Sequence, residues 1–275
     1  MQEYIFLYAL ALIWTVFAAF QDVKTTLVSN WLSFSLIAFV LAYRSFYAIF
    51  AMDFMFFVYG LIGILIFIGL GFAFYYSRVF GGGDAKLLMG IGGILPYESY
   101  FDLISVGFGF ILLLFLVGAI YTLIYSLFLI GKDINEFKKE FKSYLRRFRF
   151  LVFFGIVLGA IILFLGNEIY GSYLYFAFLV IVLMPLLFIY VKTVEKKFMI
   201  RNVSPNDLIE GDWLERDVKS GRRMIRRSVH GLSLEEINIL KKVKKKVWIK
   251  TGVPFTPVFV ISLIIFLIFL RYSSF

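Results

Sequence analysis

Long uninterrupted apolar runs restrict this chain more than any other feature of its sequence. A helix needs roughly 20 apolar residues to cross a bilayer. Seven runs of about that length occur, at residues 4–20, 31–51, 54–77, 103–130, 150–166, 172–191 and 254–270. Hydrophobic residues make up 61% of the 275 residues, whereas soluble domains are about half apolar. The sequence therefore predicts an all-α polytopic membrane protein.

The distribution of basic residues indicates how the runs are oriented. A shorter apolar run at 85–96 ends at Pro96 and is too short to cross an undisturbed bilayer alone. If it is counted as a span and the N-terminus lies outside, 26 of the 28 Lys and Arg residues fall in inside loops, at 21–30, 78–86, 131–149 and 192–253. Cytoplasmic loops carry the excess of Lys and Arg. We therefore predict about eight transmembrane helices, one of them short, in the cell (plasma) membrane.

Two aspartates lie at the predicted cytoplasmic ends of spans. Asp22 directly follows the first run, and Asp84 follows three glycines and opens the short fourth helix. Two close carboxyl groups can divide the roles of acid and base and hydrolyse an amide through an activated water. The structural alternative is that Asp84 caps a helix and Asp22 is an interfacial charge. Their common side and common position at span ends favour a catalytic pair.

Several neighbours could support this pair. Gly81 and Gly83 remove side chains beside Asp84, so that backbone or substrate can approach closely and positive φ is allowed. Lys86 could neutralise the aspartates or face lipid phosphate, and Asn30 lies at the start of the second run. Arg44, inside the second run, is interpreted as an arginine that reaches the interface or pairs with another group.

The composition also excludes some site classes. There is no Cys and one His, His230, so the chain cannot form a Cys-ligated zinc site or a two-His metal motif. We expect no metal and no cofactor. The net charge of +10 is attributed to cytoplasmic loops near anionic lipid, with the bilayer as partner and no nucleic acid.

The chain divides into five predicted parts. These are a catalytic transmembrane core at 1–130, a basic cytoplasmic loop at 131–149, a transmembrane helix pair at 150–191, a cytoplasmic module at 192–253 and a C-terminal transmembrane helix at 254–275. In the module, Ser233-Leu-Glu-Glu236 reads as a capping box that opens a helix to about Lys245. Val247-Trp-Ile-Lys250 reads as a short strand. The module is therefore predicted to be small and α+β.

Two segments of the sequence, one around each aspartate, resemble motifs of a known family. Gly81-Gly-Gly-Asp84-Ala-Lys86-Leu-Leu resembles the GxGDxKLL signature of type IV prepilin and archaeal preflagellin peptidases, which are GxGD aspartyl membrane proteases (class III signal peptidases). The segment from Asp22 to Val28-Ser29-Asn30 resembles the family's other element, an Asp followed by Ile-Pro-Asn, with Ser29 in place of Pro. Three later segments, Glu210-Gly-Asp212, Gly231–Glu236 and Lys250–Phe255, resemble the C-terminal region of archaeal members.

The resemblance implies an aspartic-type endopeptidase. Asp22 and Asp84 would be the catalytic pair, and the substrates would be prepilin-like or pre-archaellin proteins, cut between a short basic leader and a hydrophobic helix at the cytoplasmic face. Bacterial members that also methylate the new N-terminus carry a cysteine-bearing region, so the absence of Cys implies that no methyltransferase activity is expected.

Two alternatives remain open from the sequence. A polytopic transporter or proton relay could use Asp22 and Asp84, although transporters usually hold such carboxylates near the middle of the bilayer. A non-catalytic membrane assembly factor could act through the module at 192–253.

Overall fold

A computed structural model describes residues 2–166, 172–220, 223–243 and 246–273. The chain forms two compact units, which are described separately. Unit 1 contains residues 1–124 and 252–275, and unit 2 contains residues 125–251. The last apolar helix thus belongs with the first four helices, although 127 residues of unit 2 separate it from them in sequence.

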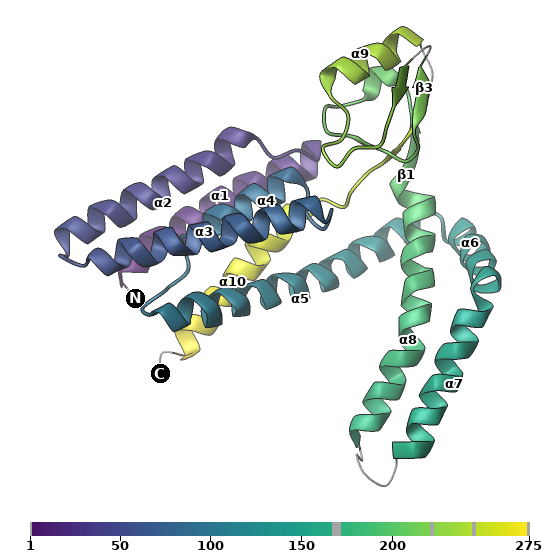
Figure 1. Cartoon of the computed structure of the whole chain (residues 1–275), viewed down its shortest axis with the longest axis horizontal. Helices are drawn as coiled ribbons and strands as arrows, with labels where there is room; N and C mark the ends of the chain where they lie inside the picture. Colours follow the sequence, from purple (N-terminus) through teal and green to yellow (C-terminus); the bar gives the residue numbers. More distant parts are fainter. Residues whose placement is uncertain (1, 167–171, 221–222, 244–245, 274–275) are drawn as a thin grey trace. The chain divides into compact units, whose positions relative to one another are not determined.

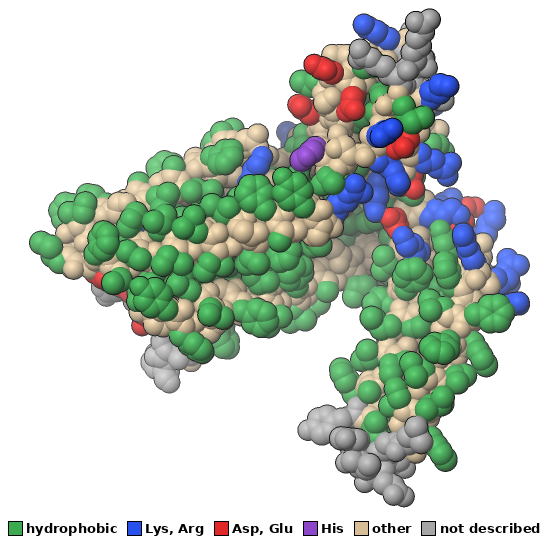
Figure 2. Space-filling model, viewed as in Figure 1, with side chains coloured by type: hydrophobic (Ala, Val, Ile, Leu, Met, Phe, Trp, Pro, Cys, Tyr) green, Lys and Arg blue, Asp and Glu red, His purple; other side chains and the backbone are tan. Residues whose placement is uncertain are grey.

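Unit 1 is helical throughout its described part (Figure 1). A short 3-10 turn, η1 (Gln2–Tyr4), leads into α1 (Ile5–Thr25), α2 (Asn30–Phe50), α3 (Phe54–Tyr76), α4 (Gly82–Ile91), the first part of α5 (Tyr100–Lys132) and α10 (Thr256–Ser273). The chain turns sharply between helices, and Asp53 caps α3 by accepting the N–H of Phe56 at 3.2 Å. The outer surface of these helices is largely hydrophobic (Figure 2), as expected for helices in contact with lipid.

The short helix α4 packs between α2 and α3 because glycines remove the side chains that would separate the backbones. A Cβ on Gly63 of α3 would lie 2.3 Å from the carbonyl oxygen of Gly92, and a Cβ on Gly92 would lie 2.6 Å from the carbonyl oxygen of Gly63. Both distances are far below van der Waals contact. The reciprocal approach of these two glycines places the end of α4 directly against α3 and encloses the 10-residue helix in protein.

Arg44 holds the far end of α4 in place. It is fully buried in α2, and its guanidinium donates to the carbonyl oxygens of Gly93 at 2.7 Å, Phe56 at 2.5 Å and Leu95 at 3.0 Å. The rings of Tyr4 and Phe56 lie 5.4 and 4.5 Å from the guanidinium carbon. Of the two interpretations of Arg44, reaching the interface or pairing with another group, the structure supports the second. The side chain turns inward because the carbonyls after α4 have no helical partners.

Unit 2 begins with the end of α5 and a hairpin of apolar helices. It continues through α6 (Ile134–Arg147), α7 (Arg149–Gly166), α8 (Ser172–Val194) and η2 (Glu195–Met199), a π-helix. Helices α7 and α8 run side by side in Figure 1. Helix α6 bends by 68° from α7, and it carries many of the basic residues predicted for the loop at 131–149, which is thus mainly helical.

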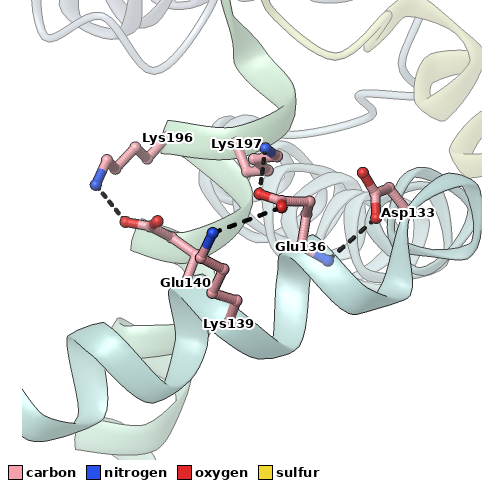
Figure 3. A network of polar contacts seen from close by, with 6 residues as sticks. All are labelled: Asp133, Glu136, Lys139, Glu140, Lys196 and Lys197. Carbon is pink, nitrogen blue, oxygen red and sulfur yellow. Dashed lines mark hydrogen bonds and ion pairs between the residues drawn. The ribbon is translucent and has the colours of Figure 1, made fainter.

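Carboxylates of α6 connect this basic helix to the base of α8 (Figure 3). Lys197 donates to Glu136 at 2.7 Å, Lys196 pairs with Glu140, and Lys139 lies 3.9 Å from the second oxygen of Glu136. Asp133 caps α6 by accepting the Glu136 N–H at 3.1 Å. The basic side chains gather around this junction in Figure 2, whereas the surfaces of α7 and α8 are mostly hydrophobic.

Reversing the charge of one residue in this network should lower the stability of the chain. Reversing the charge of its partner as well should restore that stability. Glu136→Lys places a third cation beside Lys139 and Lys197, and should lower the melting temperature by a small, measurable amount. Lys197→Glu in the same chain should restore at least half of the loss. Lys142→Glu, on the same helix, is the control for net charge. A double variant less stable than Glu136→Lys alone would contradict the pairing.

The rest of unit 2 is the small α+β module predicted from the sequence. Its elements are β1 (Ile200–Val203), η3 (Pro205–Asp207), β2 (Trp213–Leu214), β3 (Val218–Ser220), β4 (Arg223–Ile225), α9 (Leu234–Val243) and β5 (Val247–Lys250). Strand β5 lies between β1 and β2 in an antiparallel sheet, with Ile200 opposite Lys250, and β3 pairs with β4. A small core that includes Leu208, Leu240 and Ile249 joins sheet and helix.

Two predictions about the module are confirmed. Ser233 and Glu236 form the reciprocal capping box at the start of α9, with N···O distances of 2.9 and 3.3 Å. The strand expected at 247–250 is β5. Two segments singled out in the sequence also lie together, because Gly211 donates to the Leu232 carbonyl and Leu232 donates to the Asp212 carbonyl, each at 2.9 Å.

Fewer helices of the described residues are long and apolar enough to cross a membrane than the eight spans predicted. Among the described residues, five helices are long and apolar enough to cross a membrane, at Ile5–Thr25, Asn30–Phe50, Phe54–Tyr76, Tyr100–Lys132 and Leu174–Met199, and the bent pair α6–α7 would be a sixth. Eight spans are not confirmed. Helix α4 ends at Ile91 after 10 residues, and the described apolar part of α10, Thr256–Tyr272, is also short. The chain is a membrane protein with fewer full-length apolar helices than its hydrophobic runs indicated.

Candidate active site

Asp22 faces into unit 1 because of its place in the repeat of α1. The buried residues of α1 include Ala11, Thr15, Ala18 and Asp22, spaced three or four residues apart. This spacing keeps them on one face of the helix. Asp22 is therefore only 8% exposed, although it lies in the last turn. The helix ends just beyond it, where Thr26 adopts a left-handed φ of 56° and donates to the Asp22 carbonyl at 2.8 Å.

Asp84 lies in the first turn of α4, not at its cap. Gly81 is the N-cap residue, the helix begins at Gly82, and the Ala85 N–H bonds to the Gly81 carbonyl at 3.1 Å. A carboxylate in the first turn is favoured by the unpaired N–H groups and the dipole of the helix. Asp84 is thus not the N-cap residue itself; its carboxyl bonds to the backbone of Gly81 and to Thr256 of α10.

The glycines before Asp84 serve close packing. None of Gly81, Gly82 and Gly83 is among the residues with positive φ, so the left-handed region that glycine allows is not used here. A Cβ on Gly83 would lie only 2.8 Å from the Cβ of Val28, in the loop between α1 and α2. At Gly82 the nearest atom would be 3.6 Å away, an ordinary contact. Gly83 therefore allows the start of α4 to approach the loop that follows Asp22.

Thr256 brings the two aspartates together. Its backbone N–H donates to Oδ2 of Asp22 at 2.9 Å, and its hydroxyl donates to Oδ1 of Asp84 at 3.1 Å. One residue at the start of α10 thus contacts both carboxylates, one from the end of α1 and one from the start of α4. Sequence reasoning missed Thr256. The only signal was that the singled-out segment Lys250–Phe255 ends one residue before it.

Lys86 and Asn30 form a separate pair beside these carboxylates. The Lys86 ammonium donates to Oδ1 of Asn30 at 2.6 Å and lies 5.7 Å from the ring of Phe34. No hydrogen bond or ion pair joins Lys86 to Asp22 or Asp84 within the described residues. The pair connects α4 to the start of α2, so its contribution to the site is to hold these two helices together.

Ser29 preserves the backbone shape that a proline would impose. Its φ is −64°, the value at which a proline ring is fixed. Its N–H and its hydroxyl both donate to Oε1 of Gln21, at 3.0 and 2.8 Å. The loop between Asp22 and Asn30 is therefore held by a side chain of α1, and the φ of Ser29 is one that a proline could also adopt.

The described residues contain no group of three or more His, Cys, Asp or Glu side chains that could hold a metal ion. The chemical groups that the structure brings together are two carboxyls, one hydroxyl and one backbone N–H. Such a set can bind and move protons, activate a water molecule and hydrogen-bond a peptide carbonyl.

Comparison with known proteins points to the same region. The model of the type IV leader peptidase family matches residues 9–127, which include Asp22 and Asp84. A preflagellin peptidase from Methanocaldococcus jannaschii is 29% identical over 79 residues, which is 29% of this chain and 33% of that protein. The aligned segment thus spans about a third of the relative's length. Residues 9–127 of this chain are thus similar to the type IV leader peptidase family.

Proposed function

We propose that the chain is a membrane aspartyl endopeptidase that removes the short basic leader of prepilin-like or pre-archaellin proteins. The observation that carries the proposal is the contact of Asp22 and Asp84 with the same residue, Thr256. Both aspartates lie within the segment that matches the leader peptidase family. The similarity to a preflagellin peptidase supports the same class of substrate.

The two carboxyls supply the acid and the base of the reaction. One carboxylate takes a proton from water, and the water oxygen attacks the scissile carbonyl carbon while the other carboxyl gives its proton to the carbonyl oxygen. The first carboxyl then protonates the departing amine as the C–N bond breaks, and the second recovers a proton from the tetrahedral intermediate. The products are a carboxylic acid and an amine, and the proposal includes no metal, cofactor or methyl transfer.

The supporting residues act on the position of Asp84. Gly83 allows α4 to lie against Val28, and the Lys86–Asn30 bond ties α4 to α2. Gly81, the N-cap, also lies beside Asp84, since a Cβ there would be 3.4 Å from Oδ2. Alignment of acid and base within a fraction of an ångström is what makes such a pair effective.

The site is proposed to face the cytoplasm, with the N-terminus outside. Asp22 lies at the end of α1 that carries Lys24, and Asp84 lies at the end of α4 that carries Lys86. Basic residues mark the cytoplasmic ends of spans. In a prepilin-like precursor, the basic leader is cytoplasmic and the hydrophobic helix enters the bilayer. The junction between leader and helix would therefore lie at the level of the two aspartates.

The positions of the aspartates argue against a transporter. Transporters bind their ions near the middle of the bilayer on broken helices. Asp22 is in the last turn of α1 and Asp84 in the first turn of α4, so both carboxyls lie at helix ends. Among the described residues, no contact made by the module supports the other alternative, a non-catalytic membrane assembly factor.

The test of the proposal is cleavage of a defined precursor. The purified chain is incubated in lipid vesicles with a prepilin-like precursor and, separately, a pre-archaellin, and the products are identified by mass spectrometry. The expected result is one cut between the basic leader and the hydrophobic helix. Absence of any cut across several such precursors, with the chain folded and inserted, would contradict the proposal.

Substitution at Gly83 should reduce cleavage more than substitution at its neighbour. Gly83→Ala forces its Cβ against the Cβ of Val28 and displaces the start of α4, so we expect kcat to fall about tenfold or more. Gly82→Ala, with 3.6 Å of space, is the matched control and should cleave within about twofold of wild type.

A second substitution tests the cause of that loss. Because the obstructing atom is the Cβ of Val28, Val28→Gly should restore part of the activity lost in Gly83→Ala, whereas Val28→Ala should not. Equal cleavage by the Gly82 and Gly83 variants would refute the role of close approach.

A further inference from the structure

Thr256 contacts both aspartates through two different groups. The backbone N–H meets Asp22 and the side-chain hydroxyl meets Asp84. The residue itself has no exposed surface; its bond to Asp22 is buried and its bond to Asp84 is partly buried. A buried residue that bonds to two acidic groups at once is held more narrowly than its role as the first residue of α10 requires.

The backbone N–H and the hydroxyl of Thr256 differ in the hydrogen bonds that they can form with a carboxyl group. A backbone N–H can only donate, and its position is set by the helix, so it fixes one acceptor oxygen of Asp22 in place. A hydroxyl can rotate and can donate or accept, so it can bond to Asp84 whether or not that carboxyl carries a proton. The two aspartates are thus chemically unequal, although each is a buried or half-buried Asp at a helix end.

The packing around Thr256 fixes its place. Helix α10 lies against α1, and the adjacent Phe255 ring lies 5.3 Å from the ring of Phe80, which precedes the glycines of α4. A Cβ on Gly118 of α5 would lie 2.8 Å from the Phe255 ring. Contacts of the Phe255 ring with Phe80 and with α5 therefore hold the start of α10, where Thr256 lies, in place.

We propose that Thr256 is a positioning residue that makes Asp22 the base and Asp84 the acid of the cleavage reaction. This inference rests on the proposed function and assigns a role within it. Asp22, whose Oδ2 is fixed by the N–H, takes the proton of water. Asp84, held by a hydroxyl that can bond to it with or without its proton, donates to the carbonyl oxygen. Thr256 lies outside the segment 9–127 that matches the family, so the proposed site extends beyond that segment to α10.

Removal of the hydroxyl should lower turnover and leave substrate binding unchanged. Thr256→Val keeps the backbone N–H, the β-branched shape and the volume. We expect kcat to fall about 30-fold with KM within about twofold. The alkaline limb of the pH profile of kcat should move up by about half a pH unit, because the Asp84 carboxylate loses a donor that stabilises its ionised form.

Two variants separate this role from a structural one. Thr256→Ser retains the hydroxyl and should recover activity to within about threefold of wild type, with an unmoved pH profile. Thr15→Val is the matched control, because Thr15 is a fully buried threonine of α1 whose hydroxyl bonds only within its own helix, to the carbonyls of Ala11 and Leu12. It should leave kcat and the pH profile unchanged.

A stability measurement tests the contact without relying on cleavage. In a double-mutant cycle, Thr256→Val and Asp84→Asn should show coupled changes in melting temperature, since the two side chains share one bond. Thr256→Val and Asn30→Ala should be additive, because Asn30 bonds to Lys86.

The outcomes of these experiments distinguish the role of Thr256 from the proposed function as a peptidase. If wild type cleaves and Thr256→Val equals it in kcat and pH profile, the role of Thr256 is overturned and the proposed function stands. An additive Thr256–Asp84 cycle also overturns the role. If wild type cleaves no precursor, the proposed function fails, and the assignment of Thr256 to a reaction fails with it even where the cycle shows coupling. Low kcat, a moved pH limb, rescue by serine and a coupled cycle together support the inference.

Discussion

Asp22→Asn and Asp84→Asn should each reduce precursor cleavage by a factor of about 10³ or more. An amide has nearly the shape of a carboxyl but cannot take a proton from water or give one to a carbonyl oxygen, and general acid or base catalysis typically contributes about 10²–10⁴-fold. The acid and the base act as a unit, so loss of either one disables the pair. The two single variants and the double variant should therefore be almost equally inactive. The measurement is the initial rate of product formation in lipid vesicles at matched amounts of folded protein.

Asp53→Asn is the matched control for this experiment. Asp53 caps α3 in the same unit by accepting the Phe56 N–H, and asparagine is as good an N-cap as aspartate. The variant should cleave at the wild-type rate. Retention of more than about a tenth of wild-type activity by Asp84→Asn, with Asp53→Asn unchanged, would refute the catalytic pair.

Arg44→Met should destabilise unit 1 more than any other single change considered for the fold. The guanidinium donates to three carbonyl oxygens, those of Gly93, Phe56 and Leu95. Methionine fills much of the volume but leaves buried acceptors without donors, which costs about 1–3 kcal/mol each. A total of about 3 kcal/mol or more is expected. The melting temperature in detergent should therefore fall by roughly 6–12 °C.

Two further variants isolate the cause. Arg271→Met, at the exposed end of α10, removes the same charge and should change the melting temperature by no more than about 1 °C. Arg44→Lys keeps the charge but has one nitrogen and cannot reach three carbonyls in a planar fork, so it should fall between wild type and Arg44→Met. Stability of Arg44→Met equal to that of Arg271→Met would show that the three carbonyls find other donors.

Local patterns in the sequence were sufficient for most individual elements. The capping box at Ser233 and the strand at 247–250 depend on residues within a few positions of each other, and both are confirmed. The two aspartates stood out because each directly follows an apolar run or a glycine run. The family segment at 9–127 contains both.

Properties that depend on contacts between distant segments were missed or misread. The glycines before Asp84 were expected to allow close approach or positive φ, but only the structure identifies Val28, 55 residues earlier, as the segment that approaches Gly83. Arg44 was expected to reach the interface or to pair, and only the structure identifies its partners after α4, carbonyls about 50 residues later in the chain. Neither partner can be identified from a local pattern.

The number of spans illustrates the same limit. Counting apolar residues treats every long run as a separate crossing. In the structure, the run at 150–166 belongs to a helix that bends by 68° from α6, and α4 stops at Ile91 because it is packed within protein. Apolar length shows that a segment can be buried, but not whether lipid or protein buries it.

The sequence by itself determined that this is a helical membrane protein with two carboxylates at helix ends, because hydrophobic length and helical periodicity are local properties of the chain. Only the tertiary structure decided that the two carboxylates meet at Thr256, a residue separated from them by 234 and 172 positions. The physical reason is that the packing of α10 against α1 depends on the summed shape of many side chains. The hydrogen bonds of Thr256 exist only once that packing has formed.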